Sequence, residues 1–137
     1  MGKQALHHNY NAVYRLVYHL VLVSKYRRKV FTDETLKRCE EIFVDLCSSQ
    51  GGELLECSGE ADHVHALLDM PPKVQPSVLV NLLKTVSSRR LRAEFPALRT
   101  AYRGKPVLWS PSYCLVSAGG APLEILRQYV ENQNRPD

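Results

Sequence analysis

A nearly continuous apolar run at residues 13–23 constrains the fold of this chain more than any other feature. The run reads Val-Tyr-Arg-Leu-Val-Tyr-His-Leu-Val-Leu-Val, and β-branched and aromatic residues dominate it. A strand that is buried on both faces has this pattern, because neither face has to meet water. The run therefore predicts a central strand, preceded by a polar and loosely held segment at residues 1–11.

Cap and turn residues divide the rest of the chain into further elements. Three helices are expected, from Thr32 or Asp33 to Gly51–Gly52, from Pro76 to Phe95–Pro96, and from Pro122 to about Gln133. Strands are expected at residues 53–58, 63–70 and 113–117, with a turn at 59–62 and a loop at 97–112.

The order is therefore strand, helix, strand, strand, helix, strand, helix. Its first six elements predict an α+β fold with a ferredoxin-like βαββαβ arrangement, in which an antiparallel sheet carries helices on one face. The seventh element is an added C-terminal helix. A length of 137 residues with 45% hydrophobic residues suits one domain over 1–137, with no linker or repeat within it.

The chain is mildly basic, with a net charge of +4, and its cations are clustered. The clusters are Lys25, Arg27, Arg28 and Lys29; Lys84, Arg89, Arg90 and Arg92; and Arg99, Arg103 and Lys105. Any one of them alone is most simply a solvated surface. Three together favour a partner that carries phosphate groups.

The four cysteines, Cys39, Cys47, Cys57 and Cys114, form no CxxC motif. We expect them to be reduced and mostly buried thiols of a cytoplasmic protein. The longest apolar stretch, at residues 20–23, is far too short to span a membrane, and no stretch at the N-terminus has the layout of a signal peptide.

The first candidate site is the sequence Asp62-His63-Val64-His65. Side chains two residues apart on a strand point to the same face, so His63 and His65 can converge on one ion. Imidazole nitrogen is a common ligand for divalent transition metals. Two ordinary histidines, at least one of them satisfying a local hydrogen bond, are the alternative, and the HxH pattern alone leaves it open.

The second candidate site lies on the last expected helix, where Tyr129 and Gln133 are four residues apart and share a face. A tyrosine hydroxyl has a pKa of about 10 and is a poor nucleophile near neutral pH. A nearby metal would make a phosphate more electrophilic and favour the phenolate, and the Gln133 amide oxygen could serve as a third ligand. A half-buried packing tyrosine is the alternative.

Several segments together resemble the single-tyrosine HUH transposases of the IS200/IS605 family. These segments are Tyr18-His19-Leu20-Val21, Lys25-Tyr26-Arg27-Arg28, Asp62-His63-Val64-His65, Leu108-Trp109-Ser110-Pro111-Ser112-Tyr113 and Tyr129-Val130-Glu131-Asn132-Gln133. They stand in the family's order and cover nearly the whole chain. The HUH pattern alone is weakly specific, whereas the segments in sequence are highly specific.

The resemblance implies a homodimeric enzyme of the prokaryotic cytoplasm, associated with the nucleoid when bound to DNA. It implies that Tyr129 attacks single-stranded DNA and leaves a 5′-phosphotyrosine and a free 3′-OH. His63, His65 and Gln133 would hold Mg²⁺ or Mn²⁺, and the tyrosine helix could complete the partner subunit's site. The family also recognises DNA hairpins at element ends, for which Lys84, Arg89, Arg90, Arg92 and Arg27 are candidate contacts, with His19 and Tyr26 as weaker ones.

Three other functions stay open from the sequence. A domesticated relative would cut repeated palindromes without moving itself. A non-catalytic nucleic-acid-binding module could share this topology, although the chain has no RNP-like run of aromatic residues to stack bases. A metal-dependent hydrolase would use water as the nucleophile, with Tyr129 in a structural role.

Overall fold

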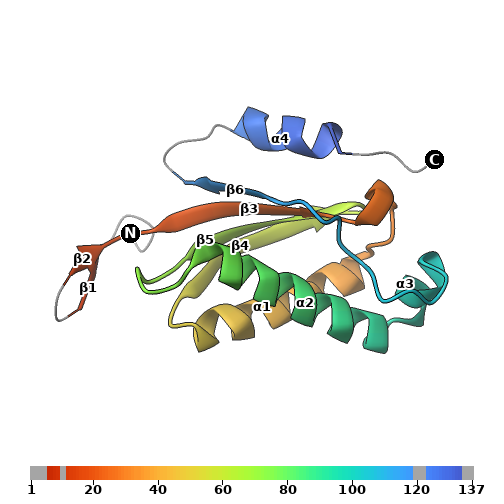
Figure 1. The fold of residues 1–137 in the computed structure, drawn as a ribbon, viewed down its shortest axis with the longest axis horizontal. Helices are drawn as coiled ribbons and strands as arrows, with labels where there is room; N and C mark the ends of the chain where they lie inside the picture. Colours follow the sequence, from red (N-terminus) through yellow and green to blue (C-terminus); the bar gives the residue numbers. More distant parts are fainter. Residues whose placement is uncertain (1–5, 10–11, 119–122, 134–137) are drawn as a thin grey trace.

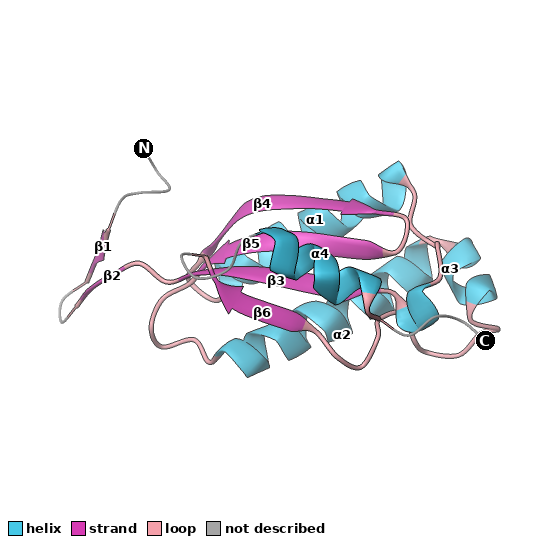
Figure 2. Ribbon diagram, turned by 90° about the horizontal axis from the view of Figure 1, so that it is seen from above, coloured by secondary structure: helices cyan, strands magenta, loops and turns pink. Residues whose placement is uncertain are grey.

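The computed structural model describes residues 6–9, 12–118 and 123–133. Figure 1 shows three layers: a pair of long helices, a four-stranded sheet, and a single short helix on the other side of the sheet. A small two-stranded sheet lies apart from these layers, near the N-terminus (Figure 2).

The main sheet is antiparallel throughout. Its strands stand in the order β4 (Glu53–Glu60), β5 (His63–Asp69), β3 (Val17–Val23) and β6 (Cys114–Ser117). The central strand β3 pairs with β5 along its whole length, and Val21 stands opposite both His65 and Cys114. A central strand is confirmed over Val17–Val23, the second part of the predicted run, and the other predicted strands and helices follow it in the expected sequence order.

The helices α1 (Asp33–Ser49) and α2 (Pro76–Glu94) cover one face of the sheet (Figure 1). Thr32 caps α1 as predicted, and its hydroxyl oxygen accepts a hydrogen bond from the Thr35 amide at 3.2 Å. The chain leaves α1 through Gly51 at φ +83°, a backbone conformation that favours glycine. The main hydrophobic core lies between these helices and the sheet, around residues such as Phe43.

The helix α4 (Leu123–Glu131) lies across the opposite face of the sheet (Figures 1 and 2). A separate small apolar cluster holds it there, in which Val130 meets Val21 and Val23 of β3. The strand β3 is therefore buried on both faces, which explains its continuous apolar run. Residues 119–122, which include the expected helix start at Pro122, lie outside the described residues.

The apolar run at 13–23 is not a single strand. Val13–Tyr14 forms β2 and pairs with β1 (His7–His8) in the small sheet, so the expected loose segment contains an ordered strand. The break comes at Arg15, whose guanidinium lies 3.5 Å from the buried Asp69 carboxylate. The Arg15 side chain is mostly buried, and the opposite charge of Asp69 stabilises its charge there.

Two short helical elements also depart from the expected loops. A 3₁₀ turn, η2 (Lys25–Arg27), follows β3, and α3 (Pro96–Ala101) occupies the first part of the predicted loop at 97–112. Pro96 begins α3 rather than only ending α2, since its fixed φ suits the first turn of a helix. Strand β4 extends to Glu60, which shortens the expected turn at 59–62. No helix among the described residues is long and apolar enough to cross a membrane.

Candidate active site

The two histidines of the HxH pattern lie side by side on one face of β5. His63 and His65 both line a pocket of about 640 Å³, while the intervening Val64 points away and is buried in the main core. The pocket opens between the sheet and α4, so that Arg127 and Glu131 of this helix form part of its wall. The predicted placement of the two imidazoles on one face of the strand is confirmed, and their convergence on one ion stays a prediction.

The Asp62 carboxylate orients His63. Its Oδ1 lies 2.9 Å from Nδ1 of His63, and its Oδ2 accepts a hydrogen bond from Nε of Arg27 at 3.0 Å. Burial would raise the pKa of Asp62, but the hydrogen bonds from His63 and Arg27 outweigh it and lower that pKa below its usual value. An ionised carboxylate holds the proton on Nδ1, which leaves the Nε2 lone pair of His63 available to a ligand.

A second histidine orients His65. Nδ1 of His19, on β3, lies 2.9 Å from Nε2 of His65, and the two rings stack with centroids 5.1 Å apart. Burial lowers the pKa of His65, and the neighbouring His19 lowers it further. The imidazole is therefore neutral near pH 7, as a metal ligand must be.

Tyr129 and Gln133 share one face of the C-terminal segment, as their spacing predicts. The Tyr129 hydroxyl lies 2.8 Å from Oγ of Ser112, and the same Oγ donates to the Gln133 amide oxygen at 3.2 Å. Burial raises the pKa of Tyr129, although the hydrogen bond with Ser112 opposes it. The phenol is therefore protonated near neutral pH.

The loop that carries Ser112 is firmly anchored. The indole Nε1 of Trp109 donates to Oγ of Ser87 on α2 at 3.0 Å, and both side chains are buried. The Lys84 ammonium donates to the carbonyls of Ser110 and Pro111, at 2.8 and 3.1 Å. These contacts fix the loop against α2 and hold Ser112 within hydrogen-bond distance of the tyrosine.

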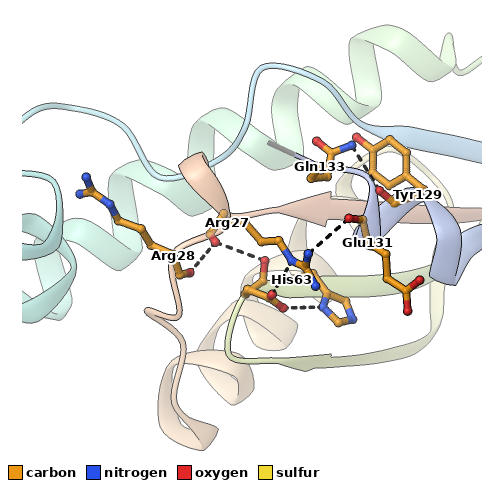
Figure 3. A network of polar contacts seen from close by, with 8 residues as sticks. Arg27, Arg28, His63, Tyr129, Glu131 and Gln133 are labelled. Atoms are coloured by element: carbon orange, nitrogen blue, oxygen red, sulfur yellow. Dashed lines mark hydrogen bonds and ion pairs between the residues drawn. The ribbon is translucent and has the colours of Figure 1, made fainter. Parts of the chain in front are cut away.

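The structure brings together the two histidines, and separately the tyrosine and the glutamine, but it does not bring the two pairs into one pocket. Neither Tyr129 nor Gln133 is among the residues that line the histidine pocket. Figure 3 shows His63 below the Arg27 side chain, whereas Tyr129 and Gln133 lie on the C-terminal segment, away from His63. Nη1 of Arg27 donates to the Glu131 carbonyl at 3.4 Å, which links the two regions.

The candidate DNA contacts on α2 differ in their surroundings. Arg89 and Arg90 are exposed on the helix surface. Arg92 donates from Nε to Oγ of Ser88 at 3.1 Å. The Lys84 ammonium is half-buried against the 110–111 loop, and burial lowers its pKa. Arg27, the fifth candidate, forms the ion pair with Asp62.

The donor set around the pocket fits a divalent cation in part. Two imidazoles with neighbours that orient them could supply nitrogen ligands, and hydrogen-bonding partners of this kind are usual for metal-bound histidine. The described residues contain no group of three or more His, Cys, Asp or Glu side chains able to hold an ion. The Gln133 amide oxygen instead lies against Ser112 within this chain.

Sequence reasoning missed the roles of Asp62, His19 and Ser112. Asp62 could have been found, because a carboxylate directly before a candidate ligand is a natural orienting partner. The His19–His65 contact depends on the register of β3 against β5, which pairs His19 with Leu67 and Val21 with His65. No local pattern in the sequence reveals that diagonal contact.

A histidine pair on a central strand, with a tyrosine on a C-terminal helix across the same face, defines the single-tyrosine HUH class. The chain belongs to the IS200-like transposase family: the model "Transposase IS200 like" matches residues 12–133. It is 33% identical to the ISDra2 transposase TnpA of Deinococcus radiodurans over 122 residues, 89% of this chain and 86% of that protein.

Two further comparisons agree. The transposase for insertion sequence element IS200 of Salmonella typhimurium is 33% identical over 120 residues, which cover 88% of this chain and 78% of the relative. The crystal structure of a protein from Deinococcus radiodurans, described as a candidate transposase, superposes with a TM-score of 0.87 at 34% identity. That superposition covers 95% of this chain and 99% of the other.

Proposed function

We propose that this protein is a DNA transposase that cleaves and rejoins single-stranded DNA at element ends through a 5′-phosphotyrosine on Tyr129. Membership of the IS200-like family supports the class of reaction. The observation that carries the proposal is the oriented histidine pair. Each imidazole has one nitrogen engaged, by Asp62 or by His19, and both line one pocket.

In the proposed step, the Tyr129 oxygen attacks the scissile phosphorus in line with the leaving 3′ oxygen. A tyrosine–phosphate bond forms, the bond from phosphorus to the 3′ oxygen breaks, and the phenolic proton passes to solvent while the 3′ oxygen gains one. Because the phosphotyrosine keeps the energy of the broken ester, a 3′-OH from another strand can reverse the step and join new ends. Ser112 holds the tyrosine hydroxyl before the attack.

His63 and His65 would hold Mg²⁺ or Mn²⁺ together with the Gln133 amide oxygen. The ion, when bound, would withdraw charge from the non-bridging oxygens of the scissile phosphate. The Nδ1–H of His63 supports this role, since it leaves the Nε2 lone pair for coordination. Nε2 of His65 lies 2.9 Å from Nδ1 of His19, so His65 would coordinate through a nitrogen that does not accept this hydrogen bond. Gln133 would have to leave Ser112 to take part.

We further propose that the protein is a homodimer in which α4 completes the site of the partner subunit. The separation of Tyr129 and Gln133 from the histidine pocket of their own chain supports such an exchange. We also assign the sheet to the ferredoxin-like βαββαβ class, since the strand order β4-β5-β3-β6 with α1 and α2 as crossovers is the order that class requires. Recognition of hairpin ends would fall partly to the exposed Arg89 and Arg90.

A covalent-capture assay tests the proposed function. The protein is incubated with labelled single-stranded DNA that carries the element end and its flank, with Mn²⁺ or Mg²⁺, and resolved on a denaturing gel. We expect a metal-dependent protein–DNA adduct that is lost in Tyr129→Phe and in His63→Ala. Cleavage without any adduct would instead identify water as the nucleophile, and binding without cleavage would identify a non-catalytic DNA-binding protein.

Mixing two inactive variants tests the exchange of α4. Tyr129→Phe lacks the nucleophile and His63→Ala lacks a ligand, so each homodimer is inactive. If α4 acts on the partner's pocket, one site of a mixed dimer combines His63 of the Tyr129→Phe chain with Tyr129 of the His63→Ala chain and is intact. The other site lacks both groups. Adducts should therefore form on the His63→Ala chain. If each chain acts in its own site, both sites of the mixed dimer stay defective.

A further inference from the structure

A second pocket, of about 310 Å³, lies between η2 and the C-terminal end of α3, outside the histidine pocket. Its polar lining consists of Lys25, Tyr26, Arg28, Tyr102, Arg103 and Lys105. Two basic clusters that lie about 75 residues apart in the sequence therefore meet here. We call this site the η2–α3 pocket.

The η2–α3 pocket carries a concentrated positive charge. Four of its lining residues are cationic and none is acidic. Among the described residues, Lys25, Arg103 and Lys105 take part in no ion pair. A concave surface with unneutralised cations attracts phosphate groups.

Two of the lining residues build the wall of the pocket rather than its contact surface. The Tyr102 hydroxyl donates to the Lys25 carbonyl at 2.9 Å, which joins the end of α3 to η2. The Arg28 guanidinium lies between the rings of Tyr26 and Tyr102, 5.3 and 5.1 Å from their centroids, and donates to the Ala101 carbonyl. Tyr102 is buried, whereas Tyr26 is 45% exposed.

The backbone around this pocket is strained. Within the described residues, only three non-glycine residues have positive φ: Tyr26 at 60°, Arg27 at 55° and Arg103 at 56°. Tyr26 and Arg103 line the pocket from its two sides, and Arg27 is adjacent in the chain. Bulky residues rarely adopt this conformation, and such strain tends to persist where it presents a side chain for function.

The strained turn divides its side chains between the two pockets. Tyr26 and Arg28 line the η2–α3 pocket, while Arg27, between them, lines the histidine pocket. Figure 3 shows the Arg27 and Arg28 side chains extending to opposite sides of the turn. A strand of DNA whose phosphate lies at the histidines would meet the η2–α3 pocket directly across this turn.

We propose that the η2–α3 pocket binds one nucleotide of the single-stranded DNA next to the cleavage site, with its base on the Tyr26 ring and its phosphates against Lys25, Arg103 and Lys105. An exposed aromatic ring beside cations is the usual means of holding single strands without reading their sequence. The inference rests on the proposed function, because it takes single-stranded DNA as the substrate.

Binding measurements on a cleavage-deficient protein test the pocket independently of catalysis. Fluorescence anisotropy is recorded for Tyr129→Phe with a labelled oligo(dT) of about twelve nucleotides and with a blunt duplex. Adding Arg103→Ala and Lys105→Ala should weaken oligo(dT) binding about tenfold. It should also reduce the slope of log affinity against log salt by about 1.4, the contribution of two phosphate contacts to single-stranded DNA.

The double variant Lys37→Ala with Lys73→Ala is the control for charge, and Tyr26→Phe is the control for the aromatic ring. Lys37→Ala with Lys73→Ala removes the same charge from exposed positions outside the pocket and should leave the affinity and the salt slope nearly unchanged. Tyr26→Leu should weaken oligo(dT) binding about tenfold, and Tyr26→Phe should restore it, because the ring alone stacks on a base. Photocrosslinking of the unsubstituted pocket to oligonucleotides carrying 5-iododeoxyuridine should modify Tyr26.

The proposal is overturned if the pocket variants bind oligo(dT) like the parent, if the control pair loses as much, or if duplex binding falls equally. A crosslink that maps elsewhere also overturns it. Failure of the proposed function would appear differently. The unsubstituted protein would then form no covalent adduct in the capture assay, whatever the oligo(dT) affinities of the variants are.

Discussion

At the scale of single residues, Asp62 connects the histidine pair to the rest of the site. Its carboxylate contacts His63 through one oxygen and Arg27 through the other, and Arg27 in turn reaches the Glu131 carbonyl. The orientation of His63, a proposed ligand, therefore depends on a carboxylate whose second oxygen is hydrogen-bonded to Arg27, which also contacts the end of α4. Such partners are usually required for full metal affinity.

Substitution of Asp62 should therefore weaken the proposed metal site without removing a proposed ligand. In Asp62→Asn the amide nitrogen replaces one acceptor, so that either His63 or Arg27 loses its partner. We expect Mn²⁺ affinity, measured by isothermal titration calorimetry, to fall about 10- to 100-fold. Glu60→Gln, which neutralises a neighbouring carboxylate of the same pocket, is the control. An equal loss in both variants would mean that charge alone, and not orientation, controls the affinity.

The thiols of Cys47, which is buried, and Cys57, which is partly buried, permit a prediction on pH. Burial raises the pKa of Cys47 to about 12 and that of Cys57 to about 12. Because a raised pKa lowers the thiolate fraction, iodoacetamide at pH 8 should label both roughly a thousandfold more slowly than free cysteine. Labelling should accelerate about tenfold per pH unit while the protein stays folded. Mass spectrometry of peptides measures the rates, and rapid labelling of the folded chain at pH 8 would contradict the assignment.

The residues that carry chemistry were predictable in type but not in their full environment. The HxH spacing places His63 and His65 on one face of any strand, and the spacing of four places Tyr129 and Gln133 on one face of any helix. Ser112 and His19 were not predictable in this way. Their contacts join segments 17 and 46 residues apart, and only the strand register and the anchored loop bring them together.

At the scale of elements, residues at the ends of helices decide where α1 and α2 begin. Thr32 and Thr35 form a capping box, in which each side chain bonds the backbone of the other residue. Thr32→Ala should lower the free energy of unfolding by about 1 kcal/mol, as N-cap losses usually do. Thr85→Ala, in the exposed middle of α2, should be neutral or slightly stabilising because alanine favours helix. Urea unfolding of both variants measures the difference, and equal effects would argue against the cap.

The elements that were mispredicted are short. The six residues of α3 follow a proline that the sequence also allows as a stop, and the two-residue strands β1 and β2 lack the length for a period to appear. Arg15 was the visible sign that the run at 13–23 is divided. Its partner, Asp69, lies at the end of β5 and could be identified only once the strands were paired.

At the scale of the whole molecule, the two faces of the sheet are covered unequally. The face beneath α1 and α2 carries a large continuous core, whereas on the α4 face the described side chains form a small separate cluster of Val21, Val23 and Val130. The sequence predicted the layers because α1 and α2 alternate with strands and must cross one face. It did not predict the side on which α4 lies, since a single terminal helix can pack on either face.

The described apolar cluster between α4 and the sheet is smaller than the core beneath α1 and α2. We therefore expect α4 to detach from the sheet before the other described helices do. Val130→Ala removes two buried methyl groups, about 1–2 kcal/mol, from the small cluster that the described side chains form between α4 and β3. We expect hydrogen exchange of residues 123–131 to accelerate about tenfold while β3 and β5 keep their protection. Val44→Ala, at a 45% exposed position on α1, should change neither. If exchange in α4 and in the sheet accelerated together, the helix would be a cooperative part of the core, and its transfer to a partner subunit would then require unfolding of the sheet.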